Sequence, residues 1–373
     1  MKILLSGIIF LLLFPGGVQA GKKHEHELAH KIGQMLMVGF RGLEVERDSP
    51  VVRDIKEGRV GGVILFDYDV ALQRPVRNIE SPEQLQRLIK DLQTAGDGRL
   101  LVAVDQEGGR VARLKEKHGF PETVSQAWLG EQDDPELTHA HASKTAATLD
   151  RMGININLAP VVDVNVNPEN PVIGGLKRSF SFDPDIVARH AREVILAHRE
   201  QGVLTALKHF PGHGSSTEDS HLGFTDVTRT WSSSELKPYR DLFKSPGADM
   251  VMTAHVFNAR LDPEWPATLS SRVLNGLLRK DLGFDGVIIS DDMQMKAITD
   301  NHHLETALKK TILAGTDIII FGNNLVYEED VARKAGDIIL DLVRRDKIPA
   351  ARIKEAHQRI MNLKEQIADR PAK

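Results

Sequence analysis

Eight short apolar runs alternate with helical patterns along the chain, and this alternation constrains the fold more than any other feature. Continuous apolar runs are typical of parallel strands that are buried on both faces. Strands that alternate with helices predict a parallel sheet, and eight such units indicate a closed (β/α)8 TIM barrel in a single α/β domain. The runs lie at residues 35–40, 60–66, 100–105, 154–164, 204–210, 249–255, 286–291 and 317–322.

The helical segments between these runs have recognisable starts. At Ser81-Pro82, Asp134-Pro135 and Asp183-Pro184, a capping residue precedes a proline at the first helical position. The expected helices span residues 50–57, 82–94, 135–152, 184–201, 234–243, 272–282, 304–314 and 328–345, and a final helix spans 350–369.

Composition excludes several classes of function. A formal net charge of -4 argues against a nucleic-acid-binding protein, which is usually basic. The chain has no cysteine, so disulfides, thiolate nucleophiles and cysteine-ligated zinc are excluded. With 41% hydrophobic and 27% charged residues, the chain can bury the core that a large domain needs.

The first 20 residues have the layout of a secretory signal peptide. Lys2 is followed by an apolar run over residues 3–14, a Pro-Gly-Gly break at 15–17 and a small-residue cleavage pattern that ends at Ala20. We expect cleavage after Ala20 and export to a periplasm or to the extracellular space. An uncleaved membrane anchor is the alternative, although the run is short for a span of about 20 residues.

Polar side chains follow the apolar runs at the expected carboxyl ends of the strands. Active sites of (β/α)8 barrels lie at this end, where the βα loops begin. We therefore expect these side chains to converge on one rim, whereas a solvated surface would scatter its charges. They are Asp105, Asp163, Lys208, His209, His255 and Asp291.

In the segment KHFPGHGSSTEDSH, residues 208–221, Lys208 and His209 are expected to end the fifth strand, and Pro211-Gly212 and Gly214 force a turn, so the rest of the segment is expected to be a loop. His209 and His213 have the spacing of a helical metal pair, but the turn interrupts that geometry and no H-E-x-x-H lies in the segment. Asp219 and His221 are two residues apart, so the carboxylate can orient the imidazole as a general acid/base. A histidine that bonds its own loop backbone is the alternative.

The segment FDGVIISDDMQM places two adjacent acids, Asp291 and Asp292, after an apolar strand. Such a pair suggests a nucleophile, a general base or a metal clamp. Because neighbouring strand residues point in opposite directions, one acid should face the pocket. Asp292 is then expected to cap the following turn.

The segment VAVDQEGGRVARL predicts a polar binding wall. A carboxylate such as Asp105 can accept two hydrogen bonds from a vicinal diol, and an arginine fork can donate to a hydroxyl, acetamido or carboxylate group. Arg113 is a candidate for this role, and so is Arg110, which a buried structural ion pair would explain equally well. Arg178, in the loop after the fourth strand, either points into the mouth of the barrel or caps the next helix.

Together, VDQEGGRVARL, KHFPGHGSSTEDSH and FDGVIISDDM resemble blocks of glycoside hydrolase family 3, in its bacterial β-N-acetylhexosaminidase branch. The resemblance spans residues 32–342 and implies a single (β/α)8 catalytic domain over residues 21–373. It implies that Asp291 is the nucleophile and that His221, paired with Asp219, is the general acid/base. The residues it implies for binding N-acetylglucosamine are Asp105, Arg113, Arg178, Lys208 and His209.

The resemblance implies a small N-acetylglucosamine-containing saccharide as substrate, with no metal, no organic cofactor, no nucleic acid and no protein partner. Gln294 stands where members of the branch usually have a small residue, and many relatives lack a signal peptide. The natural role is therefore open between wall turnover and the scavenging of chitin or wall fragments. A β-glucosidase, a phosphorolytic N-acetylglucosaminidase and an inactive sugar-binding protein remain as alternatives.

Overall fold

The computed structural model describes residues 16–244 and 247–368, and within them eight parallel strands close into a barrel. The order around the barrel is β1-β12-β11-β9-β7-β6-β3-β2, and β1 also pairs with β2. Each of the eight expected strands is confirmed, and so is the barrel. Their bounds are β1 Leu36–Gly39, β2 Gly62–Leu65, β3 Leu101–Val104, β6 Ile156–Asn157, β7 Leu204–Phe210, β9 Met250–Thr253, β11 Val287–Asp292 and β12 Ile318–Phe321.

Helices surround the barrel, and most of them begin and end within three residues of the predicted bounds. At Ser81 and Asp134 the predicted capping side chains accept the backbone N–H of Gln84 and Leu137. The helices are α1 Gly16–Gln34, α2 Pro50–Lys56, α3 Pro82–Ala95, α4 Gln126–Gln132, α5 Pro135–Met152, α6 Pro184–Gln201, α7 Lys237–Leu242, α8 Lys296–Thr299, α9 Leu304–Ala314, α10 Val331–Arg344 and α11 Ala350–Ala368, with a π-helix at Arg272–Asp281.

Two elements differ from the expectation. The fourth strand, expected over 154–164, is only Ile156–Asn157, because its pairing with β7 is irregular beyond Asn157, where Ala206 N donates to Ala159 O at 3.1 Å. The chain beyond it still follows its neighbour, since Val162 N donates to Lys208 O at 2.8 Å. The helix expected over 234–243 divides into a 3-10 turn, η2 Ser233–Leu236, and α7.

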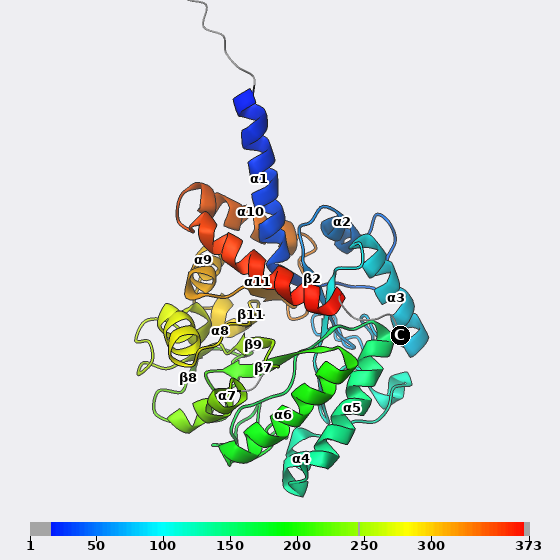
Figure 1. The fold of residues 1–373 in the computed structure, drawn as a ribbon, viewed down its shortest axis with the longest axis vertical. Helices are drawn as coiled ribbons and strands as arrows, with labels where there is room; N and C mark the ends of the chain where they lie inside the picture. The colour runs from blue at the N-terminus through cyan, green and yellow to red at the C-terminus, as the bar shows by residue number, and fades with distance from the viewer. Residues whose placement is uncertain (1–15, 245–246, 369–373) are drawn as a thin grey trace, which may run out of the picture.

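The amino end of the barrel is closed by α11 (Figure 1). Lys364 Nζ donates to Gln34 Oε1 at 2.7 Å and to Gly61 O at 2.9 Å, just before β1 and β2. Arg352 Nη2 donates to Asp317 Oδ1 at 2.7 Å, just before β12. The carboxyl end of the strands is therefore the end left for a site.

The predicted signal peptide falls only partly within the described chain. Residues 1–15 lie outside it, and the expected cleavage point after Ala20 falls inside α1. Figure 1 shows α1 projecting from the body next to α10 and α11. Among the residues described, none of the helices combines the length and apolar character needed to cross a membrane.

Candidate active site

A cavity of about 340 Å³ opens at the carboxyl end of the strands. All eight residues proposed for the site from the sequence line it. They come from the ends of β3, β7 and β11 and from the loops after β3, β6 and β7. They are Asp105, Arg113, Arg178, Lys208, His209, Asp219, His221 and Asp291.

One wall of the cavity is a network of ion pairs centred on Lys208. The Lys208 side chain is 2% exposed, and its Nζ lies 2.8 Å from Asp105 Oδ1 and 2.6 Å from Glu107 Oε1. Arg113 Nη2 lies 3.2 Å from Asp105 Oδ2. Burial alone would raise the pKa of Asp105, but Lys208 and Arg113 outweigh it and hold that pKa well below its usual range. Asp105 is therefore a fixed anionic acceptor.

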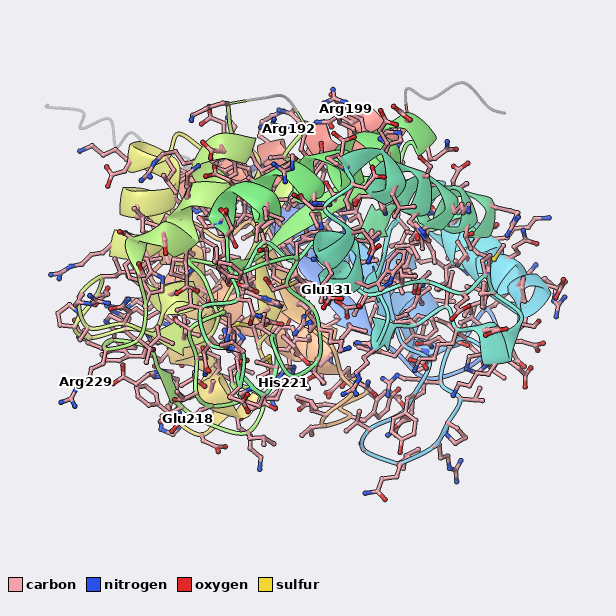
Figure 2. The ribbon with its side chains drawn as sticks, turned by 90° about the horizontal axis from the view of Figure 1, so that it is seen from below. Glu131, Arg192, Arg199, Glu218, His221 and Arg229 are labelled. Carbon is pink, nitrogen blue, oxygen red and sulfur yellow. The ribbon has the colours of Figure 1, made fainter. Side chains whose placement is uncertain are left out.

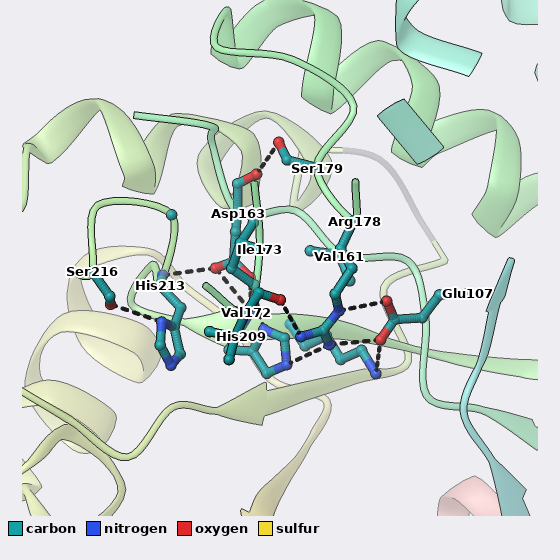
Figure 3. A network of polar contacts seen from close by, with 12 residues as sticks. Glu107, Val161, Asp163, Val172, Ile173, Arg178, Ser179, His209, His213 and Ser216 are labelled. Atoms are coloured by element: carbon teal, nitrogen blue, oxygen red, sulfur yellow. Dashed lines mark hydrogen bonds and ion pairs between the residues drawn. The ribbon is translucent and has the colours of Figure 1, made fainter. Parts of the chain in front are cut away.

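Glu107 belongs to this ion-pair network, although it does not itself line the cavity, and the sequence did not lead us to it. Arg178 Nε donates to Glu107 Oε2 at 2.8 Å, and Arg178 Nη2 donates to Oε1 at 2.7 Å (Figure 3). The ion pair holds Arg178 in the mouth of the barrel. Of the two expected positions, Arg178 therefore points inward and does not cap the next helix. The signal was available, because a residue two positions after Asp105 along an extended chain points to the same side.

His209 is oriented by Asp163, which is wholly buried behind the cavity wall. Asp163 accepts His209 Nδ1–H at 2.7 Å and the backbone N–H of His213 at 2.8 Å (Figure 3). Arg178 Nη2 donates to His209 Nε2 at 3.3 Å, so the ring presents one donor and one acceptor nitrogen. Asp163 thus supports the rim from behind and does not line the cavity.

No metal cluster is formed by three or more His, Cys, Asp or Glu side chains in the part of the chain that the structure describes. The two histidines with metal-like spacing have other partners. His209 bonds Asp163 and Arg178, and His213 bonds the hydroxyls of Ser216 and Ser220. Their ring nitrogens are therefore used within the protein.

Asp291 lies at the carboxyl end of β11, next to its last residue, Asp292. Burial would raise its pKa, but His255, His209 and His221 outweigh burial, so the pKa of Asp291 is lowered. The backbone N–H of Asp292 also donates to Asp291 Oδ1 at 2.8 Å. Asp291 is therefore an ionised carboxylate at the mouth of the barrel. His255 lies behind it, with Nε2 donating to Asp292 O at 3.0 Å.

Asp292 caps the following turn, as predicted, because its Oδ1 accepts the N–H of Gln294 at 3.0 Å and of Gly322 at 2.9 Å. Burial raises its pKa to about 6. The expectation that one acid alone faces the pocket was wrong, since both line the cavity. The register of β11 against β12 shifts between Ile289 and Asp292, and this irregularity breaks the strict alternation of side chains.

Asp219 and His221 form a hydrogen-bonded pair on the loop after β7. Asp219 Oδ1 accepts both the backbone N–H and the Nδ1–H of His221, each at 2.8 Å. Burial would lower the pKa of His221, but Asp219 and Asp291 outweigh it and raise that pKa. Because its Nδ1–H is bonded to the Asp219 carboxylate, His221 fits a general acid/base better than a histidine that bonds its own loop backbone. Figure 2 shows His221 and Glu218 at the side of the molecule opposite Arg192 and Arg199 of α6.

The glycines of KHFPGHG are required by close packing. A Cβ at Gly214 would collide with the carbonyl oxygen of Val164, and Gly212 has φ +122° and lies against Glu235. The segment is therefore a tightly packed loop, as predicted. Arg110 is exposed and outside the cavity, so neither role considered for it is met.

Comparison with known proteins agrees with this architecture. The model of the glycosyl hydrolase family 3 N-terminal domain matches residues 27–363. Beta-hexosaminidase A of Pseudoalteromonas piscicida is 33% identical over 89% of this chain and 60% of that protein. A beta-hexosaminidase of Shewanella frigidimarina is 36% identical over 78% of this chain and 82% of that protein.

Solved structures give the same result. The family 3 beta-N-acetylglucosaminidase of a Paenibacillus species superposes with a TM-score of 0.84 at 36% identity, over 93% of this chain and 64% of that one. The beta-N-acetylhexosaminidase of Beutenbergia cavernae gives 0.81 at 30% identity, over 91% of this chain and 98% of that one. The chain thus spans less than two thirds of two of these four proteins and most of the other two. The chain belongs to glycosyl hydrolase family 3 and carries the N-terminal domain of that family.

Proposed function

We propose that this protein is a retaining β-N-acetylhexosaminidase that removes terminal β-linked N-acetylglucosamine from saccharides derived from peptidoglycan or chitin. One observation carries the proposal: the ionised Asp291 and the Asp219–His221 pair line the same cavity. The names of the relatives, beta-hexosaminidase and beta-N-acetylglucosaminidase, support the choice of sugar.

In the first step, a carboxylate oxygen of Asp291 attacks the anomeric carbon of the sugar and the glycosidic bond breaks. His221 gives its Nε2 proton to the leaving oxygen, so the aglycone departs as an alcohol. Asp219 keeps the other ring nitrogen protonated and stabilises the imidazolium before transfer. The raised pKa of His221 keeps the acid form available at neutral pH.

In the second step, the neutral His221 accepts a proton from water, whose oxygen attacks the anomeric carbon. The bond to Asp291 breaks, the carboxylate is regenerated, and N-acetylglucosamine leaves with its original β configuration. A histidine thus takes the role that a second carboxylate has in most retaining glycosidases.

The ion-pair wall supplies the sugar contacts in this proposal. Asp105 offers carboxylate oxygens to a pair of hydroxyls, and Arg178 offers guanidinium N–H groups. His209, whose two ring nitrogens are bonded to Asp163 and Arg178, lines the cavity beside them. Arg113 Nε is buried and has no hydrogen-bond partner within residues 16–244 and 247–368. A buried donor without a partner is costly, and a substrate oxygen would satisfy it.

The experiment is the release of 4-nitrophenol from its N-acetyl-β-glucosaminide and from its β-glucoside, with and without chelator and phosphate. We expect cleavage of the acetamido sugar alone, unaffected by chelator. Preference for the glucoside would indicate the β-glucosidase alternative. A rate that depends on phosphate would indicate a phosphorylase, and binding without turnover would indicate an inactive sugar-binding protein.

We also propose that residues 1–20 direct export and that cleavage after Ala20 releases a periplasmic or extracellular enzyme. The positively charged start, the apolar run and the small-residue pattern support this. Mass spectrometry of the protein from cell fractions tests it. A mature chain that begins at Gly21 outside the cytoplasm is expected, and an intact cytoplasmic chain would contradict it.

A further inference from the structure

Ser220, between the two members of the acid/base pair, is buried. Its relative exposure is 1%, whereas the side chains of Asp219 and His221 are 25% and 47% exposed. The Asp219–His221 pair is therefore anchored to the protein interior through Ser220. Because Ser220 is the inward-pointing residue of the segment, its contacts decide where His221 is held.

The Ser220 hydroxyl bonds to a buried imidazole. Ser220 Oγ lies 3.0 Å from His213 Nε2, and the other nitrogen of the same ring, Nδ1, lies 2.7 Å from Ser216 Oγ. His213 thus connects two points of the loop that follows it, seven and three residues further along the chain. One of the two contacts, to Ser216, is visible in Figure 3.

His213 is itself held firmly from the barrel side. Its backbone N–H donates to Asp163 Oδ1 at 2.8 Å (Figure 3). Its carbonyl oxygen accepts Asn170 Nδ2–H at 2.7 Å. Burial, followed by the neighbouring His209, lowers the pKa of His213 to about 4, so the ring is neutral at neutral pH. A neutral ring donates from one nitrogen and accepts at the other, and serine hydroxyls suit either role.

A second contact joins this segment to the helix α8, which follows the strand that carries Asp291. Ala297 N, in α8, donates to Ser220 O at 3.3 Å. The helix α8 follows Asp291 and Asp292 within a few residues. Ser220 therefore connects His213, in the loop after β7, with α8, which follows β11.

We propose that His213 and Ser220 form a latch that positions the Asp219–His221 pair against Asp291. His213 is a positioning residue in this view, since it reaches neither the sugar nor the reacting atoms. The inference rests on the proposed function for its kinetic consequence but not for its structural one. When the latch is broken, the acid/base pair keeps its own hydrogen bond but loses its fixed place beside the glycosidic oxygen.

The test is Ser220→Ala, measured with two N-acetylglucosaminides. One carries 2,4-dinitrophenol, which leaves without a proton, and the other is N,N′-diacetylchitobiose, whose leaving sugar needs one. Loss of one hydrogen bond predicts a fall of about tenfold in kcat/KM for the chitobiose, with little change in kcat/KM for the dinitrophenyl substrate. This ratio reports the first step alone and excludes the second step, in which His221 acts as the base for both substrates. His213→Gln, which cannot reach both serines, is expected to give the same selective loss.

Ser270→Ala is the matched control. Ser270 is also buried, and its hydroxyl donates to Asp262 Oδ2 at 2.6 Å and accepts the N–H of Val273 at 3.1 Å, outside the cavity. We expect Ser270→Ala to lower the melting temperature at least as much as Ser220→Ala without separating the two substrates. The basic limb of the pH profile should not move in Ser220→Ala, because Asp219 still bonds His221.

Equal losses of kcat/KM on both substrates in Ser220→Ala would overturn the latch, and so would a selective loss of kcat/KM on the chitobiose in the control. Amide hydrogen exchange over residues 216–221 gives a second readout that does not depend on turnover. Exchange should be faster in Ser220→Ala than in the wild type, and unchanged exchange would overturn the proposal. If the wild type cleaves neither substrate, the proposed function fails, and the exchange measurement still decides the latch.

Discussion

Replacing Glu235 by Gln should stabilise the protein at neutral pH. Glu235 is wholly buried in the turn η2 beneath the KHFPGHG loop, where its Oε2 accepts the N–H of Gly214 at 3.0 Å. Burial raises its pKa to about 8, from 4.5 for an unperturbed glutamate. At neutral pH the side chain is therefore mostly protonated in the folded protein and ionised in the unfolded chain.

The size of the effect follows from linkage between proton binding and folding. A raised folded-state pKa contributes stability that is complete below pH 4.5 and is lost as the pH rises toward 8. One pKa unit corresponds to about 1.4 kcal/mol, so about 3 kcal/mol is lost between pH 4.5 and pH 7. Glutamine keeps the shape of the protonated acid and does not ionise, so Glu235→Gln should keep this free energy.

Urea unfolding of both proteins from pH 4.5 to pH 8 measures the difference. The unfolding free energies should agree near pH 4.5 and separate steadily as the pH rises, with the variant more stable. Parallel pH profiles, or a variant that is less stable at pH 7, would refute the argument that Glu235 is buried in its neutral form.

Three further substitutions test the site. Asp291→Ala should abolish turnover of both activated and natural substrates, and measurable turnover would remove Asp291 as nucleophile. Asp219→Ala should lower the pKa of His221, which moves the basic limb of the pH–rate profile to lower pH and impairs poor leaving groups most. An unmoved limb would show that the pair is misassigned. Glu107→Gln leaves Arg178 without its buried partner, so it should cost about 3 to 5 kcal/mol of stability and raise KM. A melting temperature and a KM that both equal those of the wild type would contradict that role.

The parts that the sequence predicted well are those with a local physical signal. The eight strands are continuous apolar runs, and Pro82, Pro135 and Pro184 mark helix starts unambiguously. The eight cavity residues were found because polar side chains stand where apolar strands end, and because three motifs occur in the family order.

The parts it missed depend on contacts between distant segments. The role of Glu107 depends on Arg178 and Lys208, which lie 71 and 101 positions further along the chain. The cavity-facing position of Asp292 depends on a register shift between β11 and β12. The short fourth strand depends on whether the residues after Asn157 pair regularly with β7. These contacts are not encoded in the periodicity of a single segment, although the alternation after Asp105 indicates the side that Glu107 faces.

In the proposed mechanism Asp291 forms a covalent bond to the sugar, and mass spectrometry of the protein treated with a slowly turned-over 5-fluoro-N-acetylglucosaminyl fluoride would detect that bond. We expect one added glycosyl group per chain, located on the peptide with Asp291 and absent from Asp291→Ala. A label on another residue, or turnover with inversion at the anomeric carbon, would contradict it.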